Sequence, residues 1–173
     1  MAQNKKKTTA AKKKSNGLNK LWLIGGIVVV LFIAIIVLNN QSNKTKLEDS
    51  PYDTEDLNQA TIDLLNDENY QNIILPADLQ AKIDSGEGVL GYFFSPICVH
   101  CKAFTPKLMP IADEVGVDIH QYNLLEYDAG GDDYGVTVTP TLIYFKDGVE
   151  ANRLVGDATE ESTRAFLEST VVE

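Results

Sequence analysis

Residues 95–104 have the sequence SPICVHCKAF, which contains both cysteines of the chain, Cys98 and Cys101. The run at 89–94 just before it is apolar, short and rich in aromatic residues, which predicts a buried strand. Residues 98 to 115 predict a helix. The first sulfur is therefore expected where a strand passes into a helix, and the unpaired N–H groups at the start of a helix favour a thiolate.

Three kinds of site are open to this cysteine pair. A structural disulfide suits an extracytoplasmic domain. However, a bridge between residues three apart constrains little of the unfolded chain, because its stabilisation grows with the logarithm of loop length. A zinc site needs four ligands, and the other candidates of the usual soft kind are only His100 and His120. Since no second cysteine pair at zinc spacing exists, no metal is expected.

Redox chemistry explains more of the surroundings. A Cys98 thiolate can attack a substrate disulfide, and Cys101, one turn further along the predicted helix, can then close the ring and expel the mixed disulfide. His100 places a potentially cationic ring in the same turn, so it is expected to tune the Cys98 thiolate, unless it is a plain solvated residue. His120 falls at the end of a predicted strand and is interpreted as incidental.

The N-terminal residues differ in composition from the rest. Residues 1–20 carry seven lysines and no acidic residue, and residues 21–38, LWLIGGIVVVLFIAIIVL, are 18 apolar residues without a charge. As a helix this segment is about 27 Å long, close to the minimum for crossing a bilayer. The lysines predict a basic cytoplasmic tail at 1–20, a single-pass transmembrane anchor at 21–38 and an extracellular C-terminal part. Beside such an anchor the lysines are interpreted as an orientation signal and a contact for membrane lipid, so no nucleic-acid partner is expected.

A cleavable signal peptide is the competing interpretation of this segment. Its apolar run exceeds the usual core of about 7 to 15 residues, and residues 39–42 lack a small-x-small cleavage site, which favours an uncleaved signal anchor. The polar residues 39–54 predict an extracellular stalk. After residue 38 the chain has eight basic and 25 acidic residues, a net charge of −17.

Residues 55–173 predict one α/β domain with its core at 73–170. The pattern predicts helices at 55–70, 76–85, 98–115 and 157–169, the last with Asp157 as N-cap. It predicts strands at 72–75, 89–94, 117–122, 141–145 and 149–155, with an Asp-Gly hairpin signal between the last two. Early alternation of helices and strands implies parallel pairing, and the hairpin adds antiparallel strands. A mixed central sheet flanked by helices is therefore expected.

These residues resemble the thioredoxin-like family over about 73–167. The matching landmarks are the C-x-x-C at Cys98-Val99-His100-Cys101, the kinked active-site helix with Lys102 and Pro106, and the cis-proline loop at Thr139-Pro140-Thr141. The resemblance implies a thioredoxin-like fold in which Pro140 has a cis peptide bond and packs near Cys98. It also implies that Thr139 offers its backbone N–H and C=O to an extended substrate segment, with Val99 as a further substrate-binding candidate.

Three positions depart from the cytoplasmic reductases of that family. Tyr92 stands where they carry a buried aspartate, Ile97 replaces the tryptophan before the first cysteine, and Val99-His100 replaces Gly-Pro. A histidine before the second cysteine resembles the oxidising and isomerising extracytoplasmic members instead. The direction of electron flow is therefore left open.

The leading prediction is a membrane-tethered thiol-disulfide oxidoreductase acting outside the cell membrane of a Gram-positive bacterium. Its redox-active group is a Cys98–Cys101 disulfide without any other cofactor. Its partners are exported proteins with thiols or disulfides and a membrane or extracytoplasmic redox partner. Two alternatives stay open: an accessory protein for bacteriocin export or cytochrome maturation, and a noncatalytic binding module with a structural disulfide.

Overall fold

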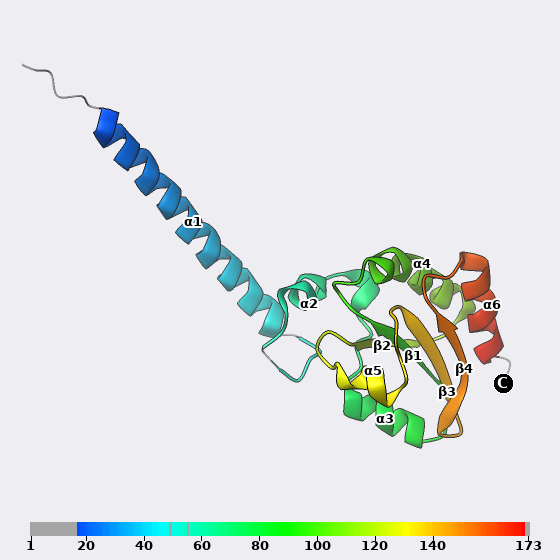
Figure 1. The fold of residues 1–173 in the computed structure, drawn as a ribbon. Coiled ribbons are helices and arrows are strands. Elements are labelled where there is room, and N and C mark those ends of the chain that lie inside the picture. Colours follow the sequence, from blue (N-terminus) through cyan, green and yellow to red (C-terminus); the bar gives the residue numbers. More distant parts are fainter. Residues whose placement is uncertain (1–16, 49, 55, 172–173) are drawn as a thin grey trace, which may run out of the picture. The chain divides into compact units, whose positions relative to one another are not determined.

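The computed structural model of the chain describes residues 17–48, 50–54 and 56–171 (Figure 1). The chain divides into two compact units, Met1–Ser42 and Asn43–Glu173. Residues 1–16 of the expected basic tail, and residues 55, 172 and 173 of the expected domain, lie outside the described residues.

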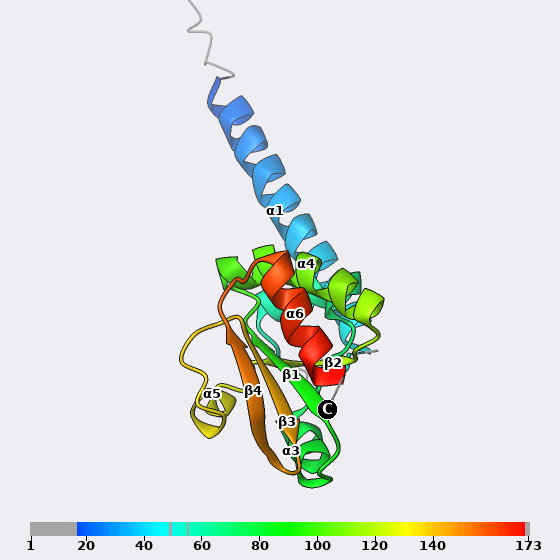
Figure 2. The same cartoon turned by 90° about the vertical axis from the view of Figure 1, so that its right-hand side faces the viewer.

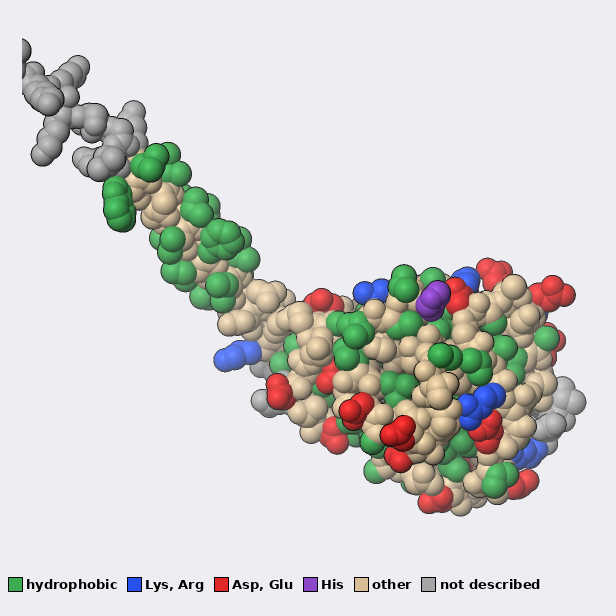
Figure 3. All heavy atoms as spheres, viewed as in Figure 1, with side chains coloured by type: hydrophobic (Ala, Val, Ile, Leu, Met, Phe, Trp, Pro, Cys, Tyr) green, Lys and Arg blue, Asp and Glu red, His purple; other side chains and the backbone are tan. Residues whose placement is uncertain are grey.

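Helix α1, Gly17–Glu48, contains the long apolar segment of the chain. Its stretch Leu21–Leu47 has the length and composition needed to cross a membrane. Apolar side chains cover its visible face until the polar last turns (Figure 3). The helix continues ten residues past the expected anchor, so the first part of the expected stalk is helical. The physical reason is that no glycine or proline interrupts the chain between residue 39 and Pro51.

The second unit contains a four-stranded sheet in the order β2-β1-β3-β4. The strands are β1 Val89–Phe94, β2 Ile119–Asn123, β3 Thr141–Lys146 and β4 Val149–Val155. β1 pairs in parallel with β2 and antiparallel with β3, and β3 pairs antiparallel with β4. The expected mixed sheet is therefore present, with β1 at its centre and buried along its whole length.

Helices cover both faces of this sheet. They are α2 Gln59–Leu64, α3 Pro76–Asp84, α4 Val99–Val115, α5 Ala129–Asp133 and α6 Glu160–Val171, with a short 3₁₀ helix η1 at Glu68–Tyr70. α4 and α6 lie on one face, and α3 and α5 lie on the other (Figures 1 and 2). Two buried clusters follow from this layering.

The two clusters meet at β1, because successive side chains of a strand point to opposite faces. Leu90, Tyr92 and Phe94 pack into the cluster under α4 and α6. Val89 and Phe93 pack into the cluster that α3 covers. Strand β1 ends just before the cysteines and is packed on both faces. This packing fixes the position at which α4 begins.

The elements before β1 differ in detail from the sequence prediction. The expected strand at 72–75 is reduced to one parallel bridge between Ile73 and Gln121, because Leu75 already serves as the N-cap residue of α3. The expected helix at 55–70 is split into α2 and η1. Each piece has its own side-chain cap, Asn58 for α2 and Asp67 for η1.

Two further helix features differ from the sequence prediction. α5 was not predicted, and the predicted N-cap of the last helix was wrong. Asp157 does not cap α6; the hydroxyl of Thr159 accepts the N–H of Ser162 at 3.2 Å instead, and Asp157 pairs with Lys107 at 2.7 Å. The carboxylate of Asp157 is therefore paired with Lys107 of α4 and does not cap α6.

Candidate active site

The turn between β1 and α4 places the first cysteine at the beginning of the helix. Cys98 is the N-cap residue of α4, with an extended backbone at φ −76° and ψ 120°. Its sulfur accepts the backbone N–H of Cys101 at 3.4 Å. Cys98 is partly exposed and Cys101 is fully buried, and both are free thiols. The two sulfurs of the motif are thus unequal in access, as an attacking and a resolving thiol must be.

A loop from far along the chain meets this helix start. The Thr139–Pro140 peptide bond is cis, which confirms the expectation, and Pro140 is buried. Cys98 Sγ donates to the carbonyl oxygen of Thr139 at 3.3 Å. The carbonyl of Pro140 accepts the N–H of Gly156 at 2.8 Å, which ties the loop to the end of β4. The loop is therefore fixed at the sulfur by hydrogen bonds on both sides of the cis bond.

Burial and hydrogen bonding separate the acidities of the two thiols. Partial burial raises the pKa of Cys98, but hydrogen bonding with the side chain of Thr139 and with the backbone of Cys101 outweighs it, so the net pKa is below the usual value. Burial raises the pKa of Cys101 to about 11, against a lowering by the backbone of Ser95. Cys98 is therefore the thiol that ionises first.

The side chains next to Cys98 are exposed. His100 is exposed in the same turn, and the hydrogen bond it contributes toward a lower Cys98 pKa comes from its backbone and not from its ring. Val99 is 71% exposed and Ile97 is 64% exposed. Val138, which precedes the cis-proline pair, is 50% exposed. Ile97 and Val138 were not predicted as site residues, although both are exposed beside the cysteine and the cis-proline. Their signal in the sequence is an apolar side chain directly beside Cys98 or Thr139.

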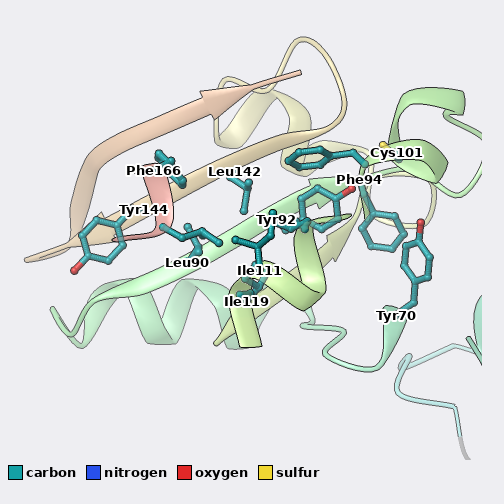
Figure 4. Close-up of a cluster of buried hydrophobic side chains, with 14 residues drawn as sticks. Tyr70, Leu90, Tyr92, Phe94, Cys101, Ile111, Ile119, Leu142, Tyr144 and Phe166 are labelled. Atoms are coloured by element: carbon teal, nitrogen blue, oxygen red, sulfur yellow. The ribbon is translucent and has the colours of Figure 1, made fainter. Parts of the chain in front are cut away.

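Behind the helix start, Cys101 joins a buried aromatic cluster. Figure 4 shows Tyr92, Phe94 and Tyr70 at the Cys101 end of that cluster, with Tyr144 at the opposite end. Tyr92 has no exposed surface, and its hydroxyl lies 2.8 Å from Thr105 Oγ1. The residue that replaces a buried aspartate is thus a neutral hydroxyl in contact with the active-site helix.

His120 lies on β2, away from the cysteine pair. It lines an open groove with Lys82 and Asp118. Burial, followed by the charge of Lys82, lowers the pKa of His120. Within the described parts of the chain, no three His, Cys, Asp or Glu side chains come together in a way that could hold a metal ion.

Comparison with known proteins identifies the family. A family model described as thioredoxin matches residues 62–169, which are more than half of the chain and contain both cysteines and Pro140. The thioredoxin of Chlamydia caviae is 43% identical over 75 residues, which span 43% of this chain and 74% of that protein. Protein disulfide-isomerase 1 of Caenorhabditis elegans is 33% identical over 94 residues, which span 51% of this chain and 19% of that protein.

Solved structures show the same fold. The J-Trx1 fragment of ERdj5 has a TM-score of 0.53 at 29% identity, over 58% of this chain and 51% of that one. The thioredoxin Mala s 13 of Malassezia sympodialis has a TM-score of 0.52 at 20% identity, over 57% of this chain and 88% of that one. The matched region has the mixed sheet, the cysteine pair at the helix start and the cis-proline described above, and the chain belongs to the thioredoxin family.

Proposed function

We propose that this protein is a membrane-tethered oxidoreductase that exchanges disulfides with exported proteins through Cys98 and Cys101. As a member of the thioredoxin family, the chain is a thiol-disulfide oxidoreductase. We assign Cys98 as the attacking thiol and Cys101 as the resolving thiol because they differ in exposure and in pKa. Cys98 is partly exposed with a lowered pKa, and Cys101 is buried with a raised pKa. An attacking thiol needs access and thiolate character, and a resolving thiol needs proximity.

The reaction has two exchange steps. The Cys98 thiolate attacks one sulfur of a substrate disulfide; a bond between Cys98 and the substrate forms, and the other substrate sulfur leaves as a thiolate. Cys101 then loses its proton, and its sulfur attacks Cys98 Sγ, so that the Cys98–Cys101 disulfide forms and the substrate is released. Two electrons pass to the substrate in this direction. The reverse sequence oxidises a substrate dithiol, and the redox partner decides which direction prevails.

The loop at the cis-proline supplies the docking site for the substrate. Thr139 has its carbonyl directed at the reactive sulfur, so an extended substrate segment that pairs with the backbone of Thr139 places its own sulfur beside Cys98. Pro140 holds this backbone in place, and Val99 contacts the segment from the helix side. His100 sits in the same turn, and the hydrogen bond from its backbone helps to tune the thiolate.

The tether and the location rest on the N-terminal residues. α1 has one stretch long and apolar enough to cross a membrane. The seven lysines of residues 1–20 favour a cytoplasmic N-terminus and contact with anionic lipid. The domain then lies outside the cytoplasm, where substrates are exported proteins and an extracytoplasmic or membrane redox partner resets the cysteine pair.

Single serine substitutions test the cysteine assignment. In Cys98→Ser, reduction of insulin disulfides by dithiothreitol in the presence of the protein should fall to the rate without the protein. Cys101→Ser should still attack the substrate and stop at a mixed disulfide. Full activity of Cys98→Ser would overturn the assignment. The wild-type protein tests the alternative of a structural bridge. If dithiothreitol reduces the Cys98–Cys101 disulfide only at concentrations that also unfold the protein, the bridge is structural.

A further inference from the structure

Three hydroxyl groups converge on the turn of α4 that holds Cys101. Thr105 is fully buried, and its Oγ1 donates to the carbonyl oxygen of Cys101 at 2.8 Å. Tyr70 donates its hydroxyl to the same Oγ1 at 3.0 Å. The hydroxyl of Tyr92 lies 2.8 Å from Oγ1. One threonine oxygen is thus the meeting point of two tyrosines and the backbone of the buried cysteine.

Counting protons shows which hydroxyl has freedom to turn. The single proton of Thr105 is used on the Cys101 carbonyl, so Oγ1 can only accept from the tyrosines. Both tyrosines donate to it in the dithiol state. If Tyr92 turns its proton elsewhere, Oγ1 keeps its own hydrogen bond to the Cys101 carbonyl and is left with a partner whether or not Tyr70 donates. The hydroxyl of Tyr92 can therefore donate to another acceptor without leaving Thr105 Oγ1 unpaired.

Burial keeps the net pKa of Cys101 raised and outweighs the hydrogen bonds from the backbone of Ser95 and the side chain of Thr139, which favour a charge on its sulfur. Tyr92 stacks on Phe94 at 5.7 Å between ring centroids and packs against Phe104 at 6.1 Å. Cys101 belongs to the same buried cluster. Among the residues that the structure describes, no Asp, Glu, Lys, Arg or His is in the buried set, so neutral hydroxyls are the polar side chains available here. An unpaired thiolate in such a place carries a large desolvation cost.

We propose that Tyr92 is the hydrogen-bond donor that stabilises the Cys101 thiolate during the resolving step, by turning its hydroxyl from Thr105 to the sulfur. The proposal rests on the proposed function of the cysteine pair. The proton of Cys101 passes to the substrate thiolate that was released in the first exchange. Tyr92 keeps its own proton throughout, so it acts as a donor and not as a base.

Two further observations agree with this role. Burial comes first among the causes that raise the pKa of Tyr92, and the charge and hydrogen bonding of Cys101 add to it. The tyrosine therefore gives up its proton less readily than an exposed tyrosine and remains a hydrogen-bond donor near neutral pH. Tyr70 also places its hydroxyl on Thr105 Oγ1, which makes Tyr70→Phe a matched control for Tyr92→Phe.

The two exchange steps can be timed separately with 5,5′-dithiobis(2-nitrobenzoate), which releases one coloured thiolate when Cys98 attacks and a second when Cys101 resolves. In the reduced full-length chain, Tyr92→Phe should leave the first release unchanged and slow the second by about 10- to 100-fold, the range expected for a lost hydrogen bond to a charged group. Tyr70→Phe removes one hydroxyl from the same oxygen and should leave both releases near the wild-type rates.

A pH profile separates this role from a purely structural one. In a Cys98→Ser background, the midpoint pH for alkylation of Cys101 should move upward on Tyr92→Phe and stay in place on Tyr70→Phe. The titratable groups that face Cys101 from its neighbours are Tyr70, Tyr92 and Cys98, and the background variant removes the last. Circular dichroism and the unchanged first release report that the variants are folded.

Each result decides one question. A second release that is unchanged in Tyr92→Phe, or slowed equally by Tyr70→Phe, would overturn the donor role while the oxidoreductase assignment stands. Loss of the first release in wild-type protein, or its persistence in Cys98→Ser, would overturn the proposed function itself. A slow second release confined to Tyr92→Phe, together with the shifted alkylation midpoint, supports the proposal.

Discussion

The backbone N–H of Cys101 is directed at the sulfur of Cys98, 3.4 Å away. This contact belongs to the main chain of the second cysteine and not to its side chain. The main chain of Cys101 therefore helps to stabilise the first thiolate, while its sulfur performs the resolving reaction. Substitution of the Cys101 side chain removes the resolving sulfur and leaves the main-chain hydrogen bond in place.

Cys101→Ser should for this reason keep a reactive Cys98. We expect the variant to form a mixed disulfide with a substrate at a rate close to that of the wild type and to hold it, because the attacking sulfur of the second step is gone. Non-reducing electrophoresis after mixing with a disulfide-containing protein measures the adduct. Cys98→Ser is the control and should give none. Absence of any adduct with Cys101→Ser would contradict the assignment of Cys98 as the attacking thiol and Cys101 as the resolving thiol.

The acidities of the two thiols predict the order of their alkylation. The pKa of Cys98 lies below the ordinary value, so a larger fraction is thiolate at neutral pH and iodoacetamide should modify it faster than a free thiol of the usual acidity. The pKa of Cys101 is about 11, so its modification should begin only in strongly alkaline solution. Mass spectrometry of the labelled peptides over a pH series measures both. Modification of Cys101 first would contradict the assignment.

Neighbouring side chains of α4 should differ sharply in their contribution to stability. Leu108 is fully buried under the sheet, so Leu108→Ala should lower the free energy of unfolding by about 2–5 kcal/mol through lost burial and a residual cavity. Lys107 pairs with Asp157 at the surface, and Lys107→Ala should cost less than about 1 kcal/mol. Urea unfolding of both variants measures the difference. Equal costs would mean that the helix is not packed as described.

Two adjacent glycines of α5 offer another matched comparison. A Cβ placed on Gly130 would lie 2.5 Å from the ring of Tyr122, whereas one on Gly131 would lie 3.4 Å from its nearest neighbour, the carbonyl oxygen of Val136. Gly130→Ala should therefore destabilise the domain by about 1–3 kcal/mol through overpacking, and Gly131→Ala should be the milder change. Thermal unfolding measures both. If Gly130→Ala is the milder of the two, the close packing of α5 on the sheet is wrong.

The orientation of the chain can be tested on intact cells that express it. A maleimide that cannot cross membranes should label Cys98 without lysis if the domain lies outside. A cytoplasmic protein with an exposed cysteine serves as the control and should be labelled only after lysis. Labelling of Cys98 that also requires lysis would contradict the proposed location and leave the chemistry of the pair unaffected.

The part of the fold around the cysteines could be predicted because its signals are local. An apolar run, the spacing of the two cysteines and a Thr-Pro-Thr segment are each legible within a few residues. α5 has no such signal: it is five residues long and contains Gly130 and Gly131, which are poor helix formers, so its stability comes from packing against Tyr122.

The hydroxyl network behind Cys101 lies beyond the reach of sequence patterns for a related reason. The continuous apolar run at 89–94 predicts that Tyr92 is buried, but its polar partner, Thr105, comes from the next element. Tyr70 reaches the same oxygen from a 3₁₀ helix that replaced part of a predicted α-helix. Contacts between elements depend on how the elements pack, and periodicity within one element carries no such information.

The carbonyl of Thr139 has one further consequence. In the free protein it accepts a hydrogen bond from the thiol of Cys98, and this is also the oxygen that an incoming peptide backbone would use for pairing. A carbonyl oxygen that already accepts a peptide N–H is a weaker acceptor for the Cys98 thiol, so pairing with a peptide weakens a contact that favours the protonated sulfur. Binding of a substrate peptide would thus favour the thiolate form of Cys98 when the substrate is in place.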